Sequence, residues 1–331
     1  MKYNILKLIC GCIAGCGVAA GLTSCENGDA EFDDFEGGTT VYFPYQYPLR
    51  TIVLGDDEYD TTLDKEHKCL IMATFGGSYN GSNGTVQIAV DDNLVSNLTF
   101  ANGMPVKAMP QDYYSLSTMN LAFNGTFNGV TTVQLTDAFF NDPDAVKATY
   151  VIPLVMTGQT GFGKILTGEL KEGATAVRTD ESMWEVKPQD YILYCVKFQN
   201  KYSGYWLTHG TMSTENIEKA NEVVVTTRSL NSSVYTVSFQ DGTETYSVDL
   251  LLTFDDSENC TITSLTEGAT ATGSGSWGDN TEKKAWGNKD RDGMELNYTV
   301  TVGGKQFSKH EKLVWWRSGI IKEEFAPVYN K

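Results

Sequence analysis

The 331-residue sequence predicts an all-β fold, and three observations support this prediction. Short apolar runs, many of them alternating with polar residues, recur about every 8 to 15 residues and are separated by turn-forming residues. No long stretch has the apolar spacing of an amphipathic helix. Aromatic residues make up 11% of the chain, and aromatic side chains suit the pleated surface of a sheet.

The first 24 residues have the features of a lipoprotein signal peptide. Lys2 and Lys7 precede an apolar, glycine-rich stretch that ends at Leu22 and Ser24, directly before Cys25. The uncharged part is about 15 residues long, which is short for a bilayer span. A small residue before the cysteine and an apolar residue three positions before it are what a lipoprotein signal peptidase requires. We therefore expect lipidation of Cys25, with the acyl chains anchoring the protein in a membrane.

Residues 25–36 form an acidic segment directly behind this cysteine and predict a solvated tether. The whole chain is also acidic, with a formal net charge of −17. A chain of this charge repels phosphate backbones, so nucleic acid is a poor partner. The charge does not exclude a neutral ligand.

Residues 37–187 predict a first module, a β-sandwich of immunoglobulin-like architecture. A glycine-rich loop, residues 76–84, ends in Asn83 and Gly84, which is typical of the tip of a hairpin. Pro143 predicts the start of a helical turn. Pro153 cannot donate to a sheet ladder, so its strand is expected at an edge. The expected strands cover residues 41–43, 70–75, 86–90, 133–135 and 150–156.

Several segments of this module resemble a known family. They are residues 41–51, Leu54 with Gly55, residues 110–116 and residues 150–154. Together they resemble an N-terminal module of Bacteroidetes surface lipoproteins encoded near SusC/SusD-type glycan-uptake systems, which also precedes some glycoside hydrolases. The acidic segment behind Cys25 likewise resembles the export tag of surface-exposed lipoproteins in these bacteria. The resemblance brings no catalytic residue with it.

Residues 190–331 predict a second module, a calycin-like antiparallel β-barrel or a second sandwich. Residues 235–239 and 246–254 alternate on either side of Asp241 and Gly242, which predicts a long hairpin. A second turn is expected at residues 290–293, before the alternating residues 294–302. The segment 200–207 resembles the opening of a C-terminal barrel-like module that is often paired with the first one.

The sequence gives no pattern for a metal site, a cofactor or a disulfide framework. His67, His209 and His310 stand far apart, and no paired cysteine motif is present. Residues 288–293 copy the start of a calcium loop, but Thr299 replaces its final Glu, so a hairpin turn is the better interpretation. Three cysteines lie beyond Cys25, and we expect them to be buried free thiols, although one disulfide between two of them is the alternative. They are Cys69, Cys195 and Cys260.

Catalytic motifs are also missing, so we do not expect an enzyme. There is no Gly-x-Ser-x-Gly elbow and no acidic run of the kind that chitinase-like hydrolases carry. Carbohydrate binding needs only aromatic rings and polar side chains. Trp277, which lies between glycines, and Trp286 are therefore the candidate ligand contacts. Tyr205 and Trp206 are further candidates, with a role in the barrel core as their alternative.

The resemblance implies a function in glycan capture. We expect a non-catalytic lipoprotein of the outer membrane, exposed on the cell surface, that retains a polysaccharide or glycoprotein glycan near a TonB-dependent importer of the SusC/SusD type. Two alternatives remain: a fimbrial subunit, and an accessory module of a glycan-degrading system with hydrolase activity. Neither the glycan nor the oligomeric state follows from the sequence.

Overall fold

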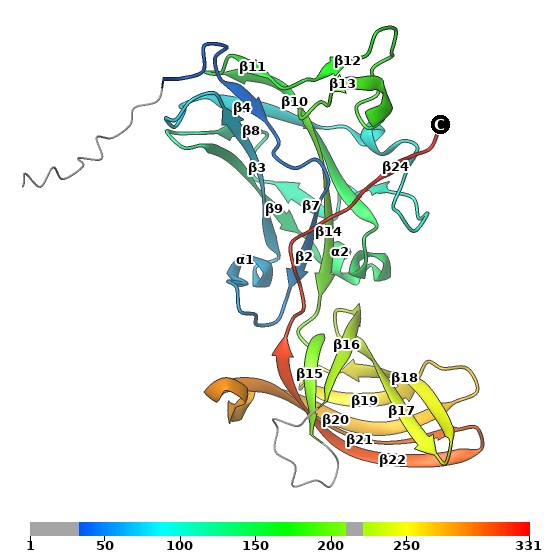
Figure 1. The fold of residues 1–331 in the computed structure, drawn as a ribbon. Coiled ribbons are helices and arrows are strands. Elements are labelled where there is room, and N and C mark those ends of the chain that lie inside the picture. The colour runs from blue at the N-terminus through cyan, green and yellow to red at the C-terminus, as the bar shows by residue number, and fades with distance from the viewer. Residues whose placement is uncertain (1–32, 210–220) are drawn as a thin grey trace, which may run out of the picture.

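The computed structural model describes residues 33–209 and 221–331, which form two all-β modules one after the other (Figure 1). The predicted fold class is confirmed, and the second module is a closed barrel. The predictions for the signal peptide, for Cys25 and for most of the acidic segment fall outside the described residues. Within the described residues, no helix combines the length and the apolar character that a membrane crossing requires.

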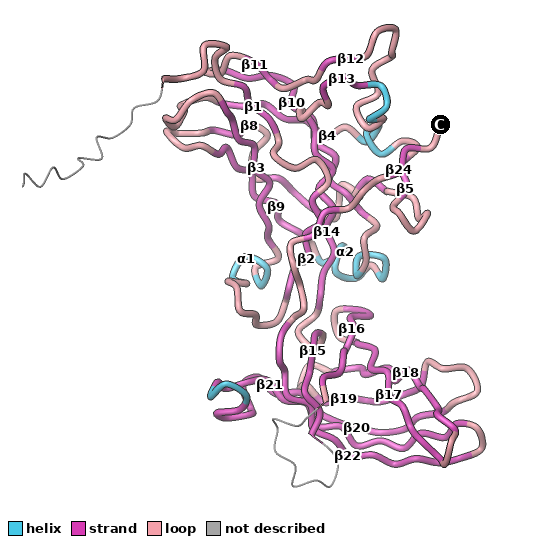
Figure 2. Tube along the Cα trace, viewed as in Figure 1, coloured by secondary structure: helices cyan, strands magenta, loops and turns pink. Residues whose placement is uncertain are grey.

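Two sheets of the first module enclose its main core (Figure 2). Apolar side chains from both sheets meet there, among them Phe43, Ile71, Val133 and Ile152. The five-stranded sheet has the order β11 (Lys164–Ile165), β1 (Thr40–Tyr42), β3 (Lys68–Gly76), β9 (Asn128–Leu135) and β7 (Tyr114–Leu116). The second sheet has the order β23 (Glu323–Glu324), β2 (Pro48–Val53), β14 (Tyr191–Gln199), β10 (Tyr150–Thr160), β4 (Thr85–Val90) and β8 (Asn120–Ala122), with β6 (Lys107–Ala108) beside β10.

Short elements complete this module. Pro143 begins a 3-10 turn, as predicted, and the Asp142 carboxylate caps it by accepting the Asp144 N–H. The other elements are α1 (Thr62–Lys65), α2 (Asp137–Asn141), two further 3-10 turns (Asp92–Val95 and Glu181–Met183), and the strand pairs β5 (Leu98–Thr99) with β24 (Val328–Tyr329) and β12 (Glu169–Leu170) with β13 (Trp184–Val186).

The predicted hairpin around residues 76–84 is wrong. β3 pairs with β1 and β9, whereas β4 pairs with β10 and β8, so the loop crosses from one sheet to the other. Its glycines permit close packing instead of a tight turn. A Cβ atom on Gly81 would lie 1.9 Å from the carbonyl oxygen of Gly125, and one on Gly84 would lie 2.3 Å from the ring of Phe162.

The expectation of an edge strand at Pro153 is also wrong, because β10 lies between β14 and β4. The Pro153 carbonyl oxygen accepts a hydrogen bond from the Asp91 N–H on the side of β10 away from β14. The nitrogen and the carbonyl of one strand residue point to the same side, so the Pro153 nitrogen also faces away from β14. There, β6 pairs only with Tyr150 and Val151, and β4 pairs only from Leu154 onward. The missing N–H therefore falls in a gap between two partner strands, and no ladder hydrogen bond is lost.

The barrel contains eight strands, and β15 and β22 close it. The hairpin at Asp241 and Gly242 is confirmed. The turn expected at residues 290–293 is wrong, because these residues lie within β21 and the reversal occurs at Trp286–Asn288. The strands are β15 (Gly204–His209), β16 (Glu222–Ser229), β17 (Ser232–Asp241), β18 (Glu244–Phe254), β19 (Asn259–Ser264), β20 (Thr270–Ala285), β21 (Lys289–Val302) and β22 (Lys305–Arg317).

The boundary between the modules lies near Asn200, about ten residues later than expected. β14 belongs to the first module, because it pairs with β10 and β2. The buried Asn200 side chain then ties the incoming chain to the barrel by donating to the Ser229 and Ser232 carbonyl oxygens.

The C-terminal segment also departs from the prediction. After β22 it runs back along the first module, where β23 pairs with β2 and β24 with β5 (Figure 1).

The three cysteines within the described residues are buried and free, as predicted. Burial raises the pKa of Cys69, Cys195 and Cys260 to about 12. These thiols are therefore protonated at neutral pH and act as small apolar side chains.

Candidate functional site

The predicted ligand contacts occupy different environments in the barrel. Trp206 is fully buried in the barrel core, so its proposed contact with a surface ligand is corrected to a packing role. Tyr205 is half-buried, with the Arg317 guanidinium 3.7 Å from the centre of its ring. Trp286 lies in the turn between β20 and β21, and its side chain is outside the described part of the structure.

Trp277 lies where the chain enters the barrel from the first module. The Lys201 ammonium is 4.5 Å from its ring centroid, and the Tyr202 ring meets it edge-on at 5.7 Å. Its indole N–H is buried and has no hydrogen-bond partner among the described residues. Trp277 is thus largely covered by its own module, which makes it a poor stacking platform.

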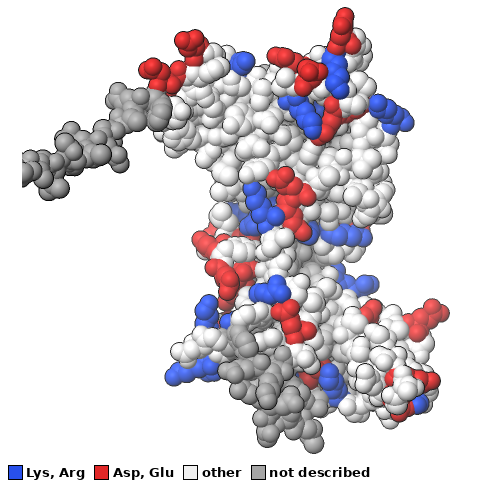
Figure 3. Space-filling model, viewed as in Figure 1, with Lys and Arg blue, Asp and Glu red and all other residues white. Residues whose placement is uncertain are grey.

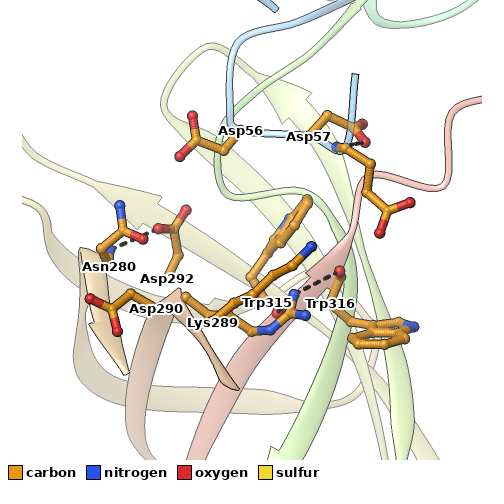
Figure 4. A pocket seen from close by; sticks show the side chains of 10 residues that line it. Asp56, Asp57, Asn280, Lys289, Asp290, Asp292, Trp315 and Trp316 are labelled. Atoms are coloured by element: carbon orange, nitrogen blue, oxygen red, sulfur yellow. Dashed lines mark hydrogen bonds between the residues drawn. The ribbon is translucent and has the colours of Figure 1, made fainter. Parts of the chain in front are cut away.

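A cleft of about 150 Å³ lies instead at the junction of the two modules (Figure 4). We call it the tryptophan cleft. Asp56, Asp57 and Glu58 contribute one wall from the loop between β2 and α1, and the barrel contributes the other. The barrel side consists of Asn280, Lys289, Asp290, Arg291, Asp292, Trp315 and Trp316.

A bulge at the end of β22 explains why two consecutive tryptophans reach one cleft. Arg317 pairs with Tyr205 and Trp315 pairs with Trp206, so Trp316 is an extra residue without a counterpart on β15. Side chains of a regular strand alternate between faces, and a bulge breaks this alternation. The sequence signal was present as two adjacent tryptophans on the last strong strand, but the bulge that brings both to the cleft depends on the partner strand.

Arg291 holds this end of β22 in place. Its side chain is 8% exposed, and its Nη1 donates to the carbonyl oxygens of Trp316 at 3.2 Å and Trp315 at 3.4 Å. The guanidinium carbon lies 4.8 Å from the centre of the Trp316 ring. Burial lowers the Arg291 pKa, but an arginine remains charged at neutral pH.

Three carboxylates meet across the junction. Oxygens of Asp56 from the first module and of Asp279 and Asp292 from the barrel lie within 4.8 Å of one another. Asp292 is 6% exposed and accepts the Asn280 N–H at 2.9 Å. Burial, helped by the charges of Asp279 and Asp56, raises the Asp292 pKa to about 6.

These carboxylates do not by themselves define a metal centre. Lys65 already pairs with Asp56, and three oxygens are fewer than the six to eight that Ca²⁺ takes. The cleft is better described as a mixed surface of indole rings, carboxylates and cationic groups. Figure 3 shows acidic and basic side chains gathered at the waist between the modules. Such a surface can pack against an apolar face and hydrogen-bond to the hydroxyl groups of a ligand.

Comparisons with known proteins match both modules. Residues 35–163 match a family of N-terminal domains, and residues 197–319 match the domain of unknown function DUF5627. No functionally curated protein matches the chain.

Solved structures from Bacteroides also match. A Bacteroides ovatus protein of unknown function is 32% identical at a TM-score of 0.83, over 90% of this chain and 100% of its own. A multidomain Bacteroides ovatus protein that includes DUF1735 is 10% identical at a TM-score of 0.36, over 83% of this chain and 92% of its own, and supports no inference. On the first of these matches, the chain belongs to a family of two-domain Bacteroides-type proteins in which such an N-terminal domain precedes DUF5627.

Proposed function

We propose that this protein is a non-catalytic, lipid-anchored protein of the cell surface that binds a glycan in the tryptophan cleft. The glycan would be retained there near a TonB-dependent importer of the SusC/SusD type. The signal peptide features and the acidic segment behind Cys25 support the location. The resemblance of the first module to lipoproteins of glycan-uptake systems supports the partner.

The composition of the tryptophan cleft is the observation that carries this proposal. One face of a sugar ring consists of C–H groups, which pack against an indole, while its hydroxyl groups need donors and acceptors at the rim. Trp315 and Trp316 supply the rings, and Asp56 and Asp292 lie within reach of the same cleft. Residues of both modules line the cleft, so a sugar held there would contact both of them.

Trp316→Ala is the variant that tests this proposal. We expect a polysaccharide that retards the wild-type protein in affinity gels to bind the variant about tenfold or more weakly, because tryptophans at the centre of an interface often dominate binding energy. Tyr79→Ala serves as a control, since Tyr79 is 67% exposed on the first module and outside the cleft.

Two results would contradict the proposal. One is equal retardation of the Trp316→Ala and wild-type proteins, and the other is no retardation by any glycan of a panel drawn from plant, host and bacterial sources. Release of reducing ends during incubation with the retained glycan would contradict the non-catalytic role and favour a hydrolase.

A further inference from the structure

A second groove lies at the junction of the modules and shares no lining residue with the tryptophan cleft. It measures about 190 Å³. The ends of β2 and β14 form one wall with Thr51 and Lys197, and the start of the barrel forms another with Tyr205 and Val224. The segment behind β22 completes it with Ile320.

Thr51 is the unusual residue of this groove. Its side chain lines the groove and is 4% exposed, yet its Oγ1 has no hydrogen-bond partner among the described residues. Thr131 shows the ordinary arrangement: it is fully buried, and its Oγ1 donates to the Thr118 carbonyl oxygen at 2.8 Å. A buried polar group without a partner is unfavourable and therefore rare. Because Thr51 lines the groove, its hydroxyl is the unpartnered polar group that a bound molecule would satisfy.

The charges at the groove are compensated. Lys197 Nζ lies 3.2 Å from the Glu323 carboxylate. Arg317, which stacks on Tyr205, pairs with Glu222 at 3.1 Å. The remaining surface includes the apolar side chains of Val224 and Ile320. These features favour a neutral ligand, because a charged one would lose its hydration without gaining an unpaired partner.

The size of the groove limits the ligand further. Its volume corresponds to roughly six water molecules in the liquid, so one ordered water would not fill it. Pockets for drug-sized ligands begin at about 300 Å³. The groove therefore suits a single ring.

We propose that this groove binds a small neutral ring that carries hydroxyl groups, such as one pyranose unit, with one hydroxyl hydrogen-bonded to Thr51. An apolar face of the ring packs against Val224 and Ile320. This proposal does not depend on glycan binding in the tryptophan cleft, because the two sites share no lining residue and each can be tested without the other.

Chemical-shift mapping on the chain that begins at Cys25 tests this proposal. The probes are methyl β-glucopyranoside, its charged analogue glucuronate, and cyclohexanol, which has the ring but a single hydroxyl. We expect methyl β-glucopyranoside to shift resonances of Thr51, Tyr205 and Val224 and to bind more tightly than the other two probes.

Three threonine variants separate hydroxyl recognition from folding. Thr51→Val should weaken the binding of methyl β-glucopyranoside about two- to tenfold, the change that one lost hydrogen bond produces. Thr51→Ser, which keeps the hydroxyl, should restore it. Thr131→Val should leave binding unchanged, because Thr131 lies in β9 and does not line the groove.

Three outcomes would overturn the proposal. They are no shift at the groove with any probe, equal binding by the Thr51→Val and wild-type proteins, and binding of glucuronate or cyclohexanol as tight as that of the methyl glucoside. Trp316→Ala should not affect binding in this groove, which distinguishes failure here from failure of the proposed glycan site.

Discussion

Asp292 lies buried among carboxylates of both modules, and this arrangement makes the stability of the protein depend on pH. Its pKa in the folded protein is about 6, above about 3.9 for an unfolded chain. Below about pH 4 the group is protonated in both states and has no effect. Between about pH 4 and 6 only the unfolded chain releases the proton, so this group lowers stability as the pH rises.

Asp292→Asn should therefore stabilise the protein at pH 7 by an amount on the order of 1–3 kcal/mol. The difference from the wild type should shrink toward zero below about pH 4. Urea unfolding across this pH range measures both quantities. Asp290→Asn is the matched control and should lower stability at pH 7 instead of raising it. Hydrogen bonds from the Lys284 N–H and from Lys283 lower the Asp290 pKa, so its ionised form stabilises the folded state. A stabilising effect of Asp292→Asn that persists unchanged at pH 3 would contradict this explanation.

The environments of individual aromatic residues could be predicted from the sequence only in part. The glycines around Trp277 suggested exposure, but Lys201 and Tyr202, from a segment distant in sequence, cover its ring. Trp316 reaches the tryptophan cleft because a bulge places an extra residue in β22. Both outcomes depend on contacts between distant segments, which local sequence does not specify. The free thiols were predictable, because an odd number of widely spaced cysteines does not suit a disulfide framework.

At the scale of elements, the C-terminal segment fastens the chain end to the first module. The Phe325 ring packs against Tyr47 and Phe100, with centroids 5.6 Å and 5.1 Å away. Its N–H donates to the Tyr47 carbonyl oxygen, and the Asn330 N–H donates to that of Asn97. This segment follows the end of β22 at the junction and pairs with strands β2 and β5 of the first module.

Phe325→Ala should lower the unfolding free energy by about 1–3 kcal/mol, less than for a fully buried phenylalanine because the ring is half-buried. Val328→Ala is the control, with an expected effect of about 0.5 kcal/mol or less, since Val328 is 49% exposed. Thermal unfolding of both variants measures the difference. Equal effects of the two substitutions would show that the segment is not a packed part of the first module.

A barrel hairpin was predictable where its second strand follows the first directly, across a recognisable turn. β17 and β18 around Asp241 and Gly242 illustrate this. In the first module, the expected strands overlap β1, β3, β4, β9 and β10, but β2 was not expected as a strand, and the pairing of these strands was not predicted correctly. β14 pairs in parallel with β2, about 145 residues earlier, and no local pattern records such a pairing. The same limit explains the misplaced boundary at residue 190.

At the scale of the whole molecule, the proposed anchor determines where the tryptophan cleft stands relative to the membrane. Cys25→Ser should abolish metabolic labelling by a fatty acid and move the protein from the membrane to the soluble fraction, because the lipid chains supply the anchoring. Cys260→Ser, which alters a buried thiol of the barrel, should leave labelling unchanged. Persistent labelling of Cys25→Ser would contradict the lipoprotein assignment.

The central claim is that a glycan binds at the junction of the two modules. Hydrogen–deuterium exchange with and without the retained glycan tests it most directly. We predict slower exchange in segments of both modules that line the tryptophan cleft, residues 54–60 of the first and residues 279–292 and 313–317 of the barrel. Protection confined to one module away from these segments, or no protection at saturating glycan, would contradict the claim.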